Sequence, residues 1–297
     1  MRMAEGGLTD AMKSLRHFLE LIKFEHTIFA LPFAYLGMLL AAGGWPTWSQ
    51  FIWITVAMAA ARTVAMGFNR IADRVIDAYN PRTASRPLVT GAISTRTAWA
   101  GTGVATIILV IAAWQLGPLP LKLVPGALLF LFGYSFTKRF TWLSHFILGF
   151  TDALAPAGAW AAVRGSLFTP DDLPAWLLTA LVTLWIGGFD LIYACQDIEV
   201  DRRHSLRSIP ARFGARVALR LSTLSHVLTI LLLALLGWVM GLAWPFWLGV
   251  LITSGLLLWE HSLVKPDDLT HLNLAFFNIN SYISLTLFIA VVAALWI

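Results

Sequence analysis

The sequence predicts an all-α integral membrane protein, built as a bundle of about nine transmembrane helices. Of its 297 residues, 58% are hydrophobic and only 12% are charged, about half the charged fraction of an ordinary soluble domain. Apolar runs long enough to cross a hydrocarbon layer of roughly 30 Å recur along the chain. Short segments rich in glycine, proline or charge separate these runs and are typical of turns. We therefore expect residues 1–297 to form a single polytopic domain.

The elements follow in order from these signals. Residues 1–20 are polar and amphipathic, lack the early apolar core of a signal peptide, and are expected to form a cytoplasmic segment. Turn sequences then mark several span ends: GGWP after the first span, LGPLP after the third, FTPDDLP before the sixth, and GLAWP and KPDDLTH around the eighth. The expected spans are residues 24–43, 50–70, 97–116, 119–137, 143–163, 174–195, 217–240, 243–262 and 274–296.

The basic residues orient these spans, because Lys and Arg are enriched in the cytoplasmic loops of membrane proteins. The N-terminal segment and alternate loops hold 18 of the 21 basic residues, whereas the opposite side holds only Lys122 and Arg164, and Arg62 lies within a span. We expect a multi-pass protein of the inner (plasma) membrane, with its N-terminus in the cytoplasm and its C-terminus outside. The net charge of +5 is thereby explained by topology, and no nucleic-acid partner is expected.

The second predicted span ends in acidic residues, within the stretch FNRIADRVIDAYNPRTASRPL. At about 100° per residue, Arg62, Asn69, Asp73 and Asp77 fall within an arc of about 100° on one helix face. Asp73 and Asp77 would lie at the cytoplasmic end, whereas Arg62 lies deeper, where an ionisable side chain is costly and usually functional. This face is therefore a candidate site.

The sixth predicted span repeats the arrangement in GGFDLIYACQDIEVDRRHSLRSIPARFG. Asp190, Tyr193, Asp197 and Asp201 share one face of the helix, and the first of them lies deep in the span. Each acidic end is followed by a similar Arg and Pro segment, SRPLVTG after the second span and RSIPARFG after the sixth. The similarity indicates a weak internal repeat, with two half-sites facing each other across the bundle. We expect the loops 73–96 and 198–216 to hold short helices that cap the site.

The donor types at these helix ends suit a hard divalent cation. Carboxylate and amide oxygens, with no cluster of His or Cys, are what Mg²⁺ prefers, and Mg²⁺ usually completes its shell with water and phosphate oxygens. The neighbouring Arg and Lys residues favour a polyphosphate ligand, whose remaining charge they would bind. Tyr134 and Lys138 lie one turn apart at the cytoplasmic end of the fourth span, and Lys138 would extend this basic set. Arg139 is expected to extend to the interface instead.

Two other interpretations account for part of the pattern. Charged residues at a helix end are often simply solvated, although this explains poorly the same period of four on two helices and the depth of Asp190 and Arg62. Intramembrane acids also mark proton or cation pathways, as in a transporter. That class predicts acids spread through the membrane, whereas most of these acids lie at one end beside basic residues.

Three motifs together resemble the UbiA superfamily of intramembrane aromatic prenyltransferases. They are NRIADRVID after the second span, YSFTK after the fourth and YACQDIEVD after the sixth. The resemblance covers nearly the whole chain. Arg70 stands where the family's first motif usually has a further Asp. The segments DAYNPRTASRPL and ACQDIEVDRRHSLRSIPARFG are most similar to the branch that makes menaquinone through futalosine.

The resemblance implies a Mg²⁺-dependent enzyme at the lipid bilayer, with its active site facing the cytoplasm. It would transfer a polyprenyl group from a polyprenyl diphosphate to a hydroxylated aromatic acid of the 4-hydroxybenzoate or dihydroxynaphthoate type, in ubiquinone or menaquinone biosynthesis. Related branches use protohaem or chlorophyllide as acceptor, and a protohaem acceptor is an alternative here.

The implied roles divide the candidate residues into three groups. Asp73, Asp77, Asp197 and Asp201 would hold Mg²⁺. Binding of the substrates would fall to Asn69, Arg82, Arg86 and Lys138 at the diphosphate end, to Tyr134, and to Arg62 for the aromatic carboxylate. The implied catalytic residues are Lys138, which stabilises the leaving group, Tyr193, and Asp190, which orients the phenol or accepts its proton. Either Tyr193 or Tyr134 would face the allylic cation with its ring.

Several other polar residues in the predicted spans are not assigned to this site. Asp152, in the fifth span, is a weaker candidate because its pairing cannot be read from the sequence. His226 shows no metal-ligand spacing with the other histidines, and Glu260 and His261 are expected at the membrane interface. The single Cys195 excludes an internal disulfide and is expected to pack in the core.

Overall fold

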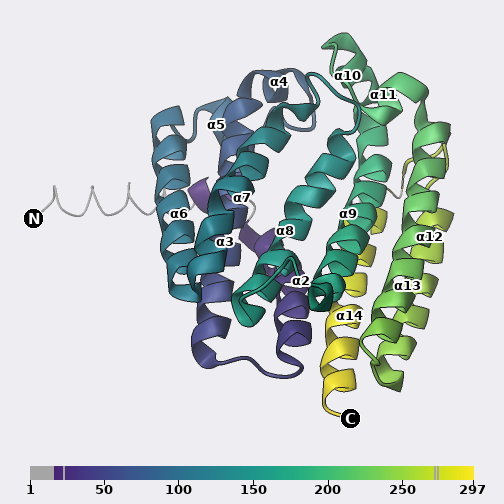
Figure 1. Cartoon of the computed structure of the whole chain (residues 1–297). Helices are drawn as coiled ribbons and strands as arrows, with labels where there is room; N and C mark the ends of the chain where they lie inside the picture. The colour runs from purple at the N-terminus through teal and green to yellow at the C-terminus, as the bar shows by residue number, and fades with distance from the viewer. Residues whose placement is uncertain (1–16, 23, 271, 273) are drawn as a thin grey trace, which may run out of the picture.

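The computed structural model describes residues 17–22, 24–270, 272 and 274–297, which form one bundle of helices (Figure 1). Within these residues there is no β-strand, only an isolated bridge between Lys265 and Asp268. The predicted all-α class is confirmed. Residues 1–16, most of the predicted segment 1–20, lie outside the described part of the chain.

Seven helices in the described ranges are long and apolar enough to cross a membrane. They are α3 (Trp48–Ala72), α6 (Thr95–Leu116), α7 (Pro118–Thr137), α8 (Ser144–Arg164), α9 (Leu173–Tyr193), α12 (Ala215–Val239) and α13 (Trp244–Leu263). The first predicted span coincides with α2 (Phe24–Ala42), in which the shorter apolar segment Leu31–Ala42 is found, and the ninth coincides with the short apolar helix α14 (Asn280–Leu295). A π-helical turn, Leu274–Ile279, precedes α14 and shortens it relative to the predicted span 274–296. Seven of the nine predicted spans are therefore shown, and nine stays a prediction.

The surface of the bundle fits a lipid environment. Large apolar side chains such as Trp238, Leu258 and Leu129 are more than two-thirds exposed. The outer helix α7 buries only 17% of its most apolar stretch, whereas the central helix α9 buries 67%. Contiguous exposed apolar surface of this kind is unusual for a soluble protein and natural for helices that face lipid.

The centre of the bundle is the pair α8 and α9, which pack closely because α8 is rich in small residues. A Cβ on Gly149 of α8 would collide with the backbone carbonyl oxygen of Thr183 on α9. Close approach of helix backbones at small residues is the usual mode of helix packing in membranes. The contact fixes α9, and with it the acidic end of that helix, at the middle of the fold.

Four short helices gather at one end of the bundle, opposite the C-terminus (Figure 1). After α3 come α4 (Arg74–Tyr79) and α5 (Pro87–Thr90); after α9 come a 3₁₀ turn (Ala194–Asp197), α10 (Ile198–Arg203) and α11 (Ile209–Phe213). The two Arg and Pro segments form similar structures, since α5 and α11 both carry proline in their first turn and end at a glycine with positive φ. Gly91 (φ 81°) and Gly214 (φ 85°) adopt a backbone conformation that side chains with a Cβ disfavour.

Candidate active site

The bundle holds a cavity of about 650 Å³ beneath the four short helices. Its walls come from α3, α7, α8 and α9 and from the loops that follow α3, α7 and α9. Every predicted site residue lines this one cavity: Arg62, Asn69, Asp73, Asp77, Arg82, Arg86, Tyr134, Lys138, Asp190, Tyr193, Asp197 and Asp201. The two acidic helix ends therefore meet in a common space, as their shared pattern in the sequence suggests.

Asp73 ends α3 and contacts two neighbours across the cavity mouth. Its Oδ2 accepts a hydrogen bond from Asn69 Nδ2 at 2.9 Å, and its Oδ1 lies 3.3 Å from Arg139 Nη2. Arg139 also donates to the Ala72 carbonyl oxygen at 2.7 Å. Arg139, which is expected to extend to the interface, keeps 41% of its side chain exposed while the end of α3 offers it a carboxylate and a free carbonyl. Burial and the nearby Asp77 carboxylate raise the pKa of Asp73 above its usual value.

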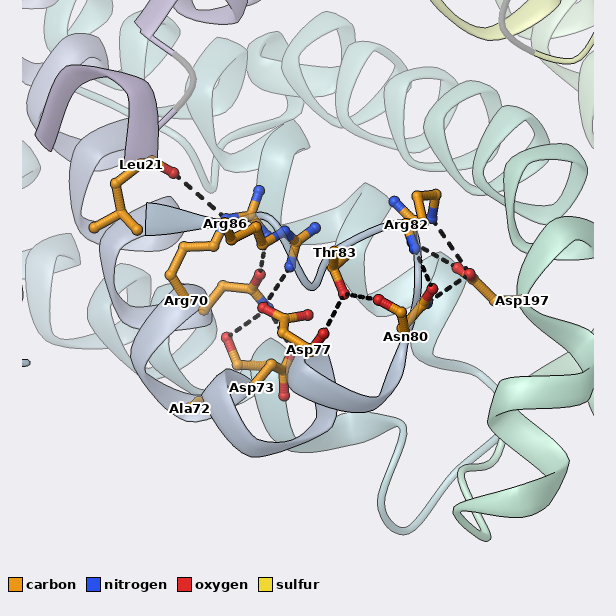
Figure 2. Close-up of polar contacts among 12 residues, drawn as sticks. Leu21, Arg70, Ala72, Asp73, Asp77, Asn80, Arg82, Thr83, Arg86 and Asp197 are labelled. Carbon is orange, nitrogen blue, oxygen red and sulfur yellow. Dashed lines mark hydrogen bonds and ion pairs between the residues drawn. The ribbon is translucent and has the colours of Figure 1, made fainter. Parts of the chain in front are cut away.

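Asp77, on α4, is paired with Arg86 from the start of α5 (Figure 2). Their Oδ2 and Nη1 atoms lie 2.6 Å apart, and the Asp77 side chain is only 9% exposed. Arg70 donates from Nη1 to Asn69 Oδ1 at 3.0 Å and from Nε to the Leu21 carbonyl at 3.4 Å. Arg70 also lines the cavity and adds a positive charge to it.

The α9 half-site is joined directly to the loop that follows α3 (Figure 2). Arg82 binds Asp197 with two hydrogen bonds, Nη2 to Oδ2 at 2.7 Å and Nε to Oδ1 at 3.3 Å. Asn80 donates from Nδ2 to the same Oδ1 at 2.9 Å. Burial alone would lower the pKa of Arg82, but Asp197 and Tyr193 raise it, so its charge is secure. Arg82 also donates to the Tyr193 hydroxyl at 3.2 Å and lies 5.0 Å above its ring centroid.

Lys138, at the end of α7, lies among the carboxylates of both half-sites. Although burial lowers the pKa of its ammonium, the charges of Asp201, Asp190, Asp197 and Asp73 raise it above the usual value. Asp201 itself is 3% exposed and accepts a hydrogen bond from Ser208 Oγ at 2.7 Å. Because carboxylates of α3 and α9 act on the same ammonium group, they belong to one electrostatic site.

Two further pairs link α8 to α9 and to α3. Asp190 Oδ2 lies 2.6 Å from Nδ1 of His145, which is fully buried. Arg62 Nη1 lies 3.7 Å from Asp152 Oδ1, so Asp152 does belong to the cavity wall. The Tyr134 hydroxyl donates to the Ala65 carbonyl of α3 at 3.0 Å, which fixes the tyrosine against that helix.

The structure adds Asn80, Arg139, Asp152 and His145 to the predicted site. A sequence signal exists for the last two, because each is an ionisable group within an apolar run. Asn80 and Arg139 carry no such signal, since their partners are 117 and 66 residues away in the sequence. Their roles follow only from the tertiary fold.

The donor set of this cavity fits a hard divalent cation together with an anionic ligand. The acidic side chains supply oxygen donors only, and buried Asn80 adds an amide. Each of Asp73, Asp77 and Asp197 is paired with an arginine. A cation would compete with the arginines for the carboxylates, and a polyphosphate would compete with the carboxylates for the guanidinium groups. The carboxylates could therefore bind the metal, and the arginines the phosphates, of a metal–diphosphate ligand.

Comparison with known proteins bears out the resemblance. The model of the UbiA prenyltransferase family matches residues 30–282. The 4-hydroxybenzoate octaprenyltransferase of Saccharophagus degradans (strain 2-40 / ATCC 43961 / DSM 17024) is 30% identical over 252 residues, which cover 85% of this chain and 82% of that protein. The apo structure of a UbiA homolog from Aeropyrum pernix K1 superposes with a TM-score of 0.83 at 34% identity, covering 91% of this chain and 98% of that one.

A more distant solved structure shares the fold. It is a UbiA homolog from Archaeoglobus fulgidus bound to GPP and Mg²⁺, with a TM-score of 0.69 at 20% identity over 93% of this chain and 99% of that one. The family match extends over most of the sequence, and the matched segment contains every predicted site residue from Arg62 to Asp201. This chain belongs to the UbiA prenyltransferase family.

Proposed function

We propose that this prenyltransferase moves a polyprenyl group from a polyprenyl diphosphate to a hydroxylated aromatic acid, with Mg²⁺ as cofactor. The observation that carries the proposal is the shared cavity, in which the acidic ends of α3 and α9 meet and Arg82 bridges to Asp197 at 2.7 Å. A transporter reading is less favoured, because the acids at the mouth are matched by guanidinium groups.

The mouth of the cavity is the proposed diphosphate site. Asp73, Asp77, Asp197 and Asp201 would hold Mg²⁺, assisted by Asn69, and the ion would supply charge neutralisation on the diphosphate oxygens. Support comes from the oxygen-only donor set described above and from the Archaeoglobus fulgidus homolog, whose structure contains GPP and Mg²⁺. The arginine partners of these carboxylates would then be released toward the phosphates.

Departure of the diphosphate is the step that the basic residues promote. Negative charge grows on the leaving group as the C–O bond breaks, and Lys138, Arg82 and Arg86 line the space where it would collect. Pre-positioned charges at a developing anion are usually the largest catalytic contribution. The raised pKa of Lys138 keeps its ammonium charged for this role.

Breaking the C–O bond leaves an allylic cation on the prenyl chain. The electron-rich face of a nearby aromatic ring would stabilise this cation. The Tyr193 ring already accepts a cation on its face, since the Arg82 guanidinium carbon lies 5.0 Å from the ring centroid. When Arg82 turns to the diphosphate, this face becomes available to the allylic cation. Tyr134, on the opposite wall, is held by its bond to α3 and serves as a second aromatic surface.

The deep end of the cavity is the proposed acceptor site. Arg62 would bind the aromatic carboxylate in place of Asp152, with which its 3.7 Å contact is loose. Asp190, oriented by its 2.6 Å contact with His145, would bind the phenol hydroxyl and accept its proton as the ring carbon beside it attacks the prenyl cation.

The acceptor is proposed to be 4-hydroxybenzoate or a dihydroxynaphthoate. The curated relative is named for transfer of an octaprenyl group to 4-hydroxybenzoate, whereas the segments around the two acidic motifs favour the dihydroxynaphthoate branch. Both acceptors carry the carboxylate and hydroxyl that Arg62 and Asp190 would bind.

We also propose that the cavity mouth faces the cytoplasm of the inner membrane. The end of the bundle that carries α4, α5, α10 and α11 also carries most of the described basic residues, which the positive-inside rule assigns to the cytoplasm. A polyprenyl tail can stay in lipid there, since each CH₂ moved into water costs about 0.8 kcal/mol. The polar substrates arrive from the cytosol.

The test is a transfer assay with purified protein in lipid nanodiscs. Labelled polyprenyl diphosphate and Mg²⁺ are supplied with 4-hydroxybenzoate or with dihydroxynaphthoate, and the prenylated product is quantified. We expect product with at least one acceptor, and none from D73A or D197A variants that remain folded. Absence of transfer to both acceptors, together with ion flux in liposomes, would refute the proposal.

A further inference from the structure

A second polar cluster lies behind the cavity wall, on helices that the proposed reaction does not use. It consists of His226 on α12 and Glu260 and His261 on α13. Their nearest ligand atoms all lie within 4.8 Å of one another. His226 is 2% exposed and Glu260 is 0% exposed, so Glu260 packs inside the bundle near the end of α13. None of the three lines the active-site cavity.

The hydrogen bonds around His226 fix which ring nitrogen carries its proton. Nε2 lies 3.2 Å from the backbone carbonyl oxygen of Trp185. A carbonyl oxygen can only accept, so the bond requires a proton on Nε2. In a neutral ring Nδ1 is then unprotonated, and its lone pair is directed to the cluster.

The same reasoning applies to His261. If the Thr223 hydroxyl donates to the Leu219 carbonyl at 3.0 Å, its oxygen accepts from His261 Nδ1 at 3.3 Å. In this tautomer Nε2 of neutral His261 is unprotonated, 2.9 Å from Nδ1 of His226. Two nitrogen lone pairs at this distance repel each other unless a positive charge lies between them.

Glu260 directs a further lone pair to the same point. Its Oε1 accepts from Asn280 Nδ2 at 3.1 Å. Its Oε2 is buried, has no hydrogen-bond partner among the described residues, and lies 3.5 Å from His226 Nδ1. A buried carboxylate oxygen without a partner is costly, and a cation beside it would remove that cost.

We propose that His226, Glu260 and His261 bind a divalent transition-metal ion of the zinc class. Two imidazoles and one carboxylate are a familiar ligand set for zinc, whereas magnesium prefers oxygen alone. Ligand atoms around a tetrahedral zinc ion lie roughly 3.3 Å apart, given bond lengths near 2.0–2.1 Å; the separations of 2.9 Å and 3.5 Å straddle this value.

The surrounding groups match the usual support of such a site. Ligating histidines normally donate their other N–H to a carboxylate, a backbone carbonyl or water, and ligating carboxylates are themselves hydrogen-bonded. The Trp185 carbonyl and Asn280 provide contacts of these kinds, and the Thr223 hydroxyl lies where His261 would have water. Because Trp185 and Asn280 also line the active-site cavity, the ion would hold α12 and α13 against the wall of that cavity.

The experiment is a Co²⁺ titration of the purified full-length chain in detergent, with excess Mg²⁺ present to occupy the carboxylate-lined cavity. Co²⁺ bound by histidines in a tetrahedral site gives strong visible absorption, which Zn²⁺ should abolish by displacement. We expect one Co²⁺ per chain, and at least a tenfold loss of affinity in H226Q and E260Q. The matched control is H204Q, because His204 is an exposed histidine outside both sites, and it should titrate like the parent protein.

Two further measurements separate this proposal from the alternatives. D197A should lose prenyl transfer and keep the Co²⁺ spectrum, so the proposed function and the metal site fail independently. Zn²⁺ should raise the melting temperature of the parent protein and not that of folded H226Q. No visible band in the parent protein, which is the result expected if a shared proton occupies the cluster, would overturn the proposal, as would unchanged affinity in H226Q.

Discussion

The guanidinium group of Arg82 spans the two halves of the site, holding Oδ2 of Asp197 at 2.7 Å and Oδ1 at 3.3 Å. Arg82 belongs to the loop after α3 and Asp197 to the turn after α9, so the contact joins segments 115 residues apart in the chain. The pair is partly accessible, with side-chain exposures of 33% and 8%. It can therefore exchange partners when a more highly charged ligand enters.

Replacing Arg82 by lysine tests this exchange. Lysine keeps the charge and loses the forked geometry that binds a carboxylate or phosphate through two bonds. We expect kcat/KM for the prenyl diphosphate to fall roughly tenfold to a hundredfold, corresponding to about 1.5–3 kcal/mol for a charged hydrogen bond. The control is R203K, since among the described residues Arg203 pairs with Glu199 alone and on the exposed surface; its activity should be unchanged, and equal effects in both variants would contradict the assignment.

Arg62 is expected to distinguish acidic from neutral acceptors. In R62M, KM for the aromatic acid should rise at least tenfold, because the carboxylate loses its cationic partner. A phenol of the same size without the carboxylate should be affected little. Steady-state kinetics with both acceptors measures the difference, and equal losses would place Arg62 elsewhere in the reaction.

His145 is a positioning residue for Asp190, which it contacts at 2.6 Å. We expect H145L to lower kcat for transfer at least tenfold while leaving the affinity for a prenyl diphosphate analogue unchanged. H145N, whose amide can reproduce the contact of Nδ1, should recover part of the rate. Loss of analogue binding in H145L would show instead that the histidine supports the cavity as a whole.

Close packing of α8 on α9 gives a stability prediction. In G149A the new methyl group meets the Thr183 carbonyl oxygen, and overpacking of this kind costs about 1–3 kcal/mol. Gly158 on the same helix has open space around an added Cβ. Thermal unfolding in detergent should therefore show a lower melting temperature for G149A and no loss for G158A; a similar loss in both would indicate a general effect of the helix.

The features that the sequence predicted correctly are local ones. Hydropathy located the helices, and the spacing of four placed Asp73 one turn from Asp77 and Asp197 one turn from Asp201. The expectation of one continuous face along each span is wrong, because α3 ends at Ala72 and α9 at Tyr193, which leaves Asp77 on α4 and Asp201 on α10. The short helices of the Arg and Pro segments were also predictable. A proline in the first turn of a helix and a glycine after its last turn are signals that lie within a few residues of each other.

Other features depend on contacts between distant segments. Arg139 contacts Asp73 because the end of α7 packs beside the end of α3, which no local pattern encodes. His226 lies 34 or more residues before Glu260 and His261, and the three meet only through the packing of α12 on α13. The start of α14 was also misplaced, because a π-helical turn is as apolar as the helix it precedes.

The central claim is that the acidic ends of α3 and α9 bind a single diphosphate. Mg²⁺-dependent binding of a non-hydrolysable prenyl thiodiphosphate should be measured in D73A, D197A and the double variant by calorimetry. If one ligand uses both ends, each single change removes binding and the double change adds little, whereas independent sites give additive losses. Full Mg²⁺-dependent binding by D197A would contradict the account.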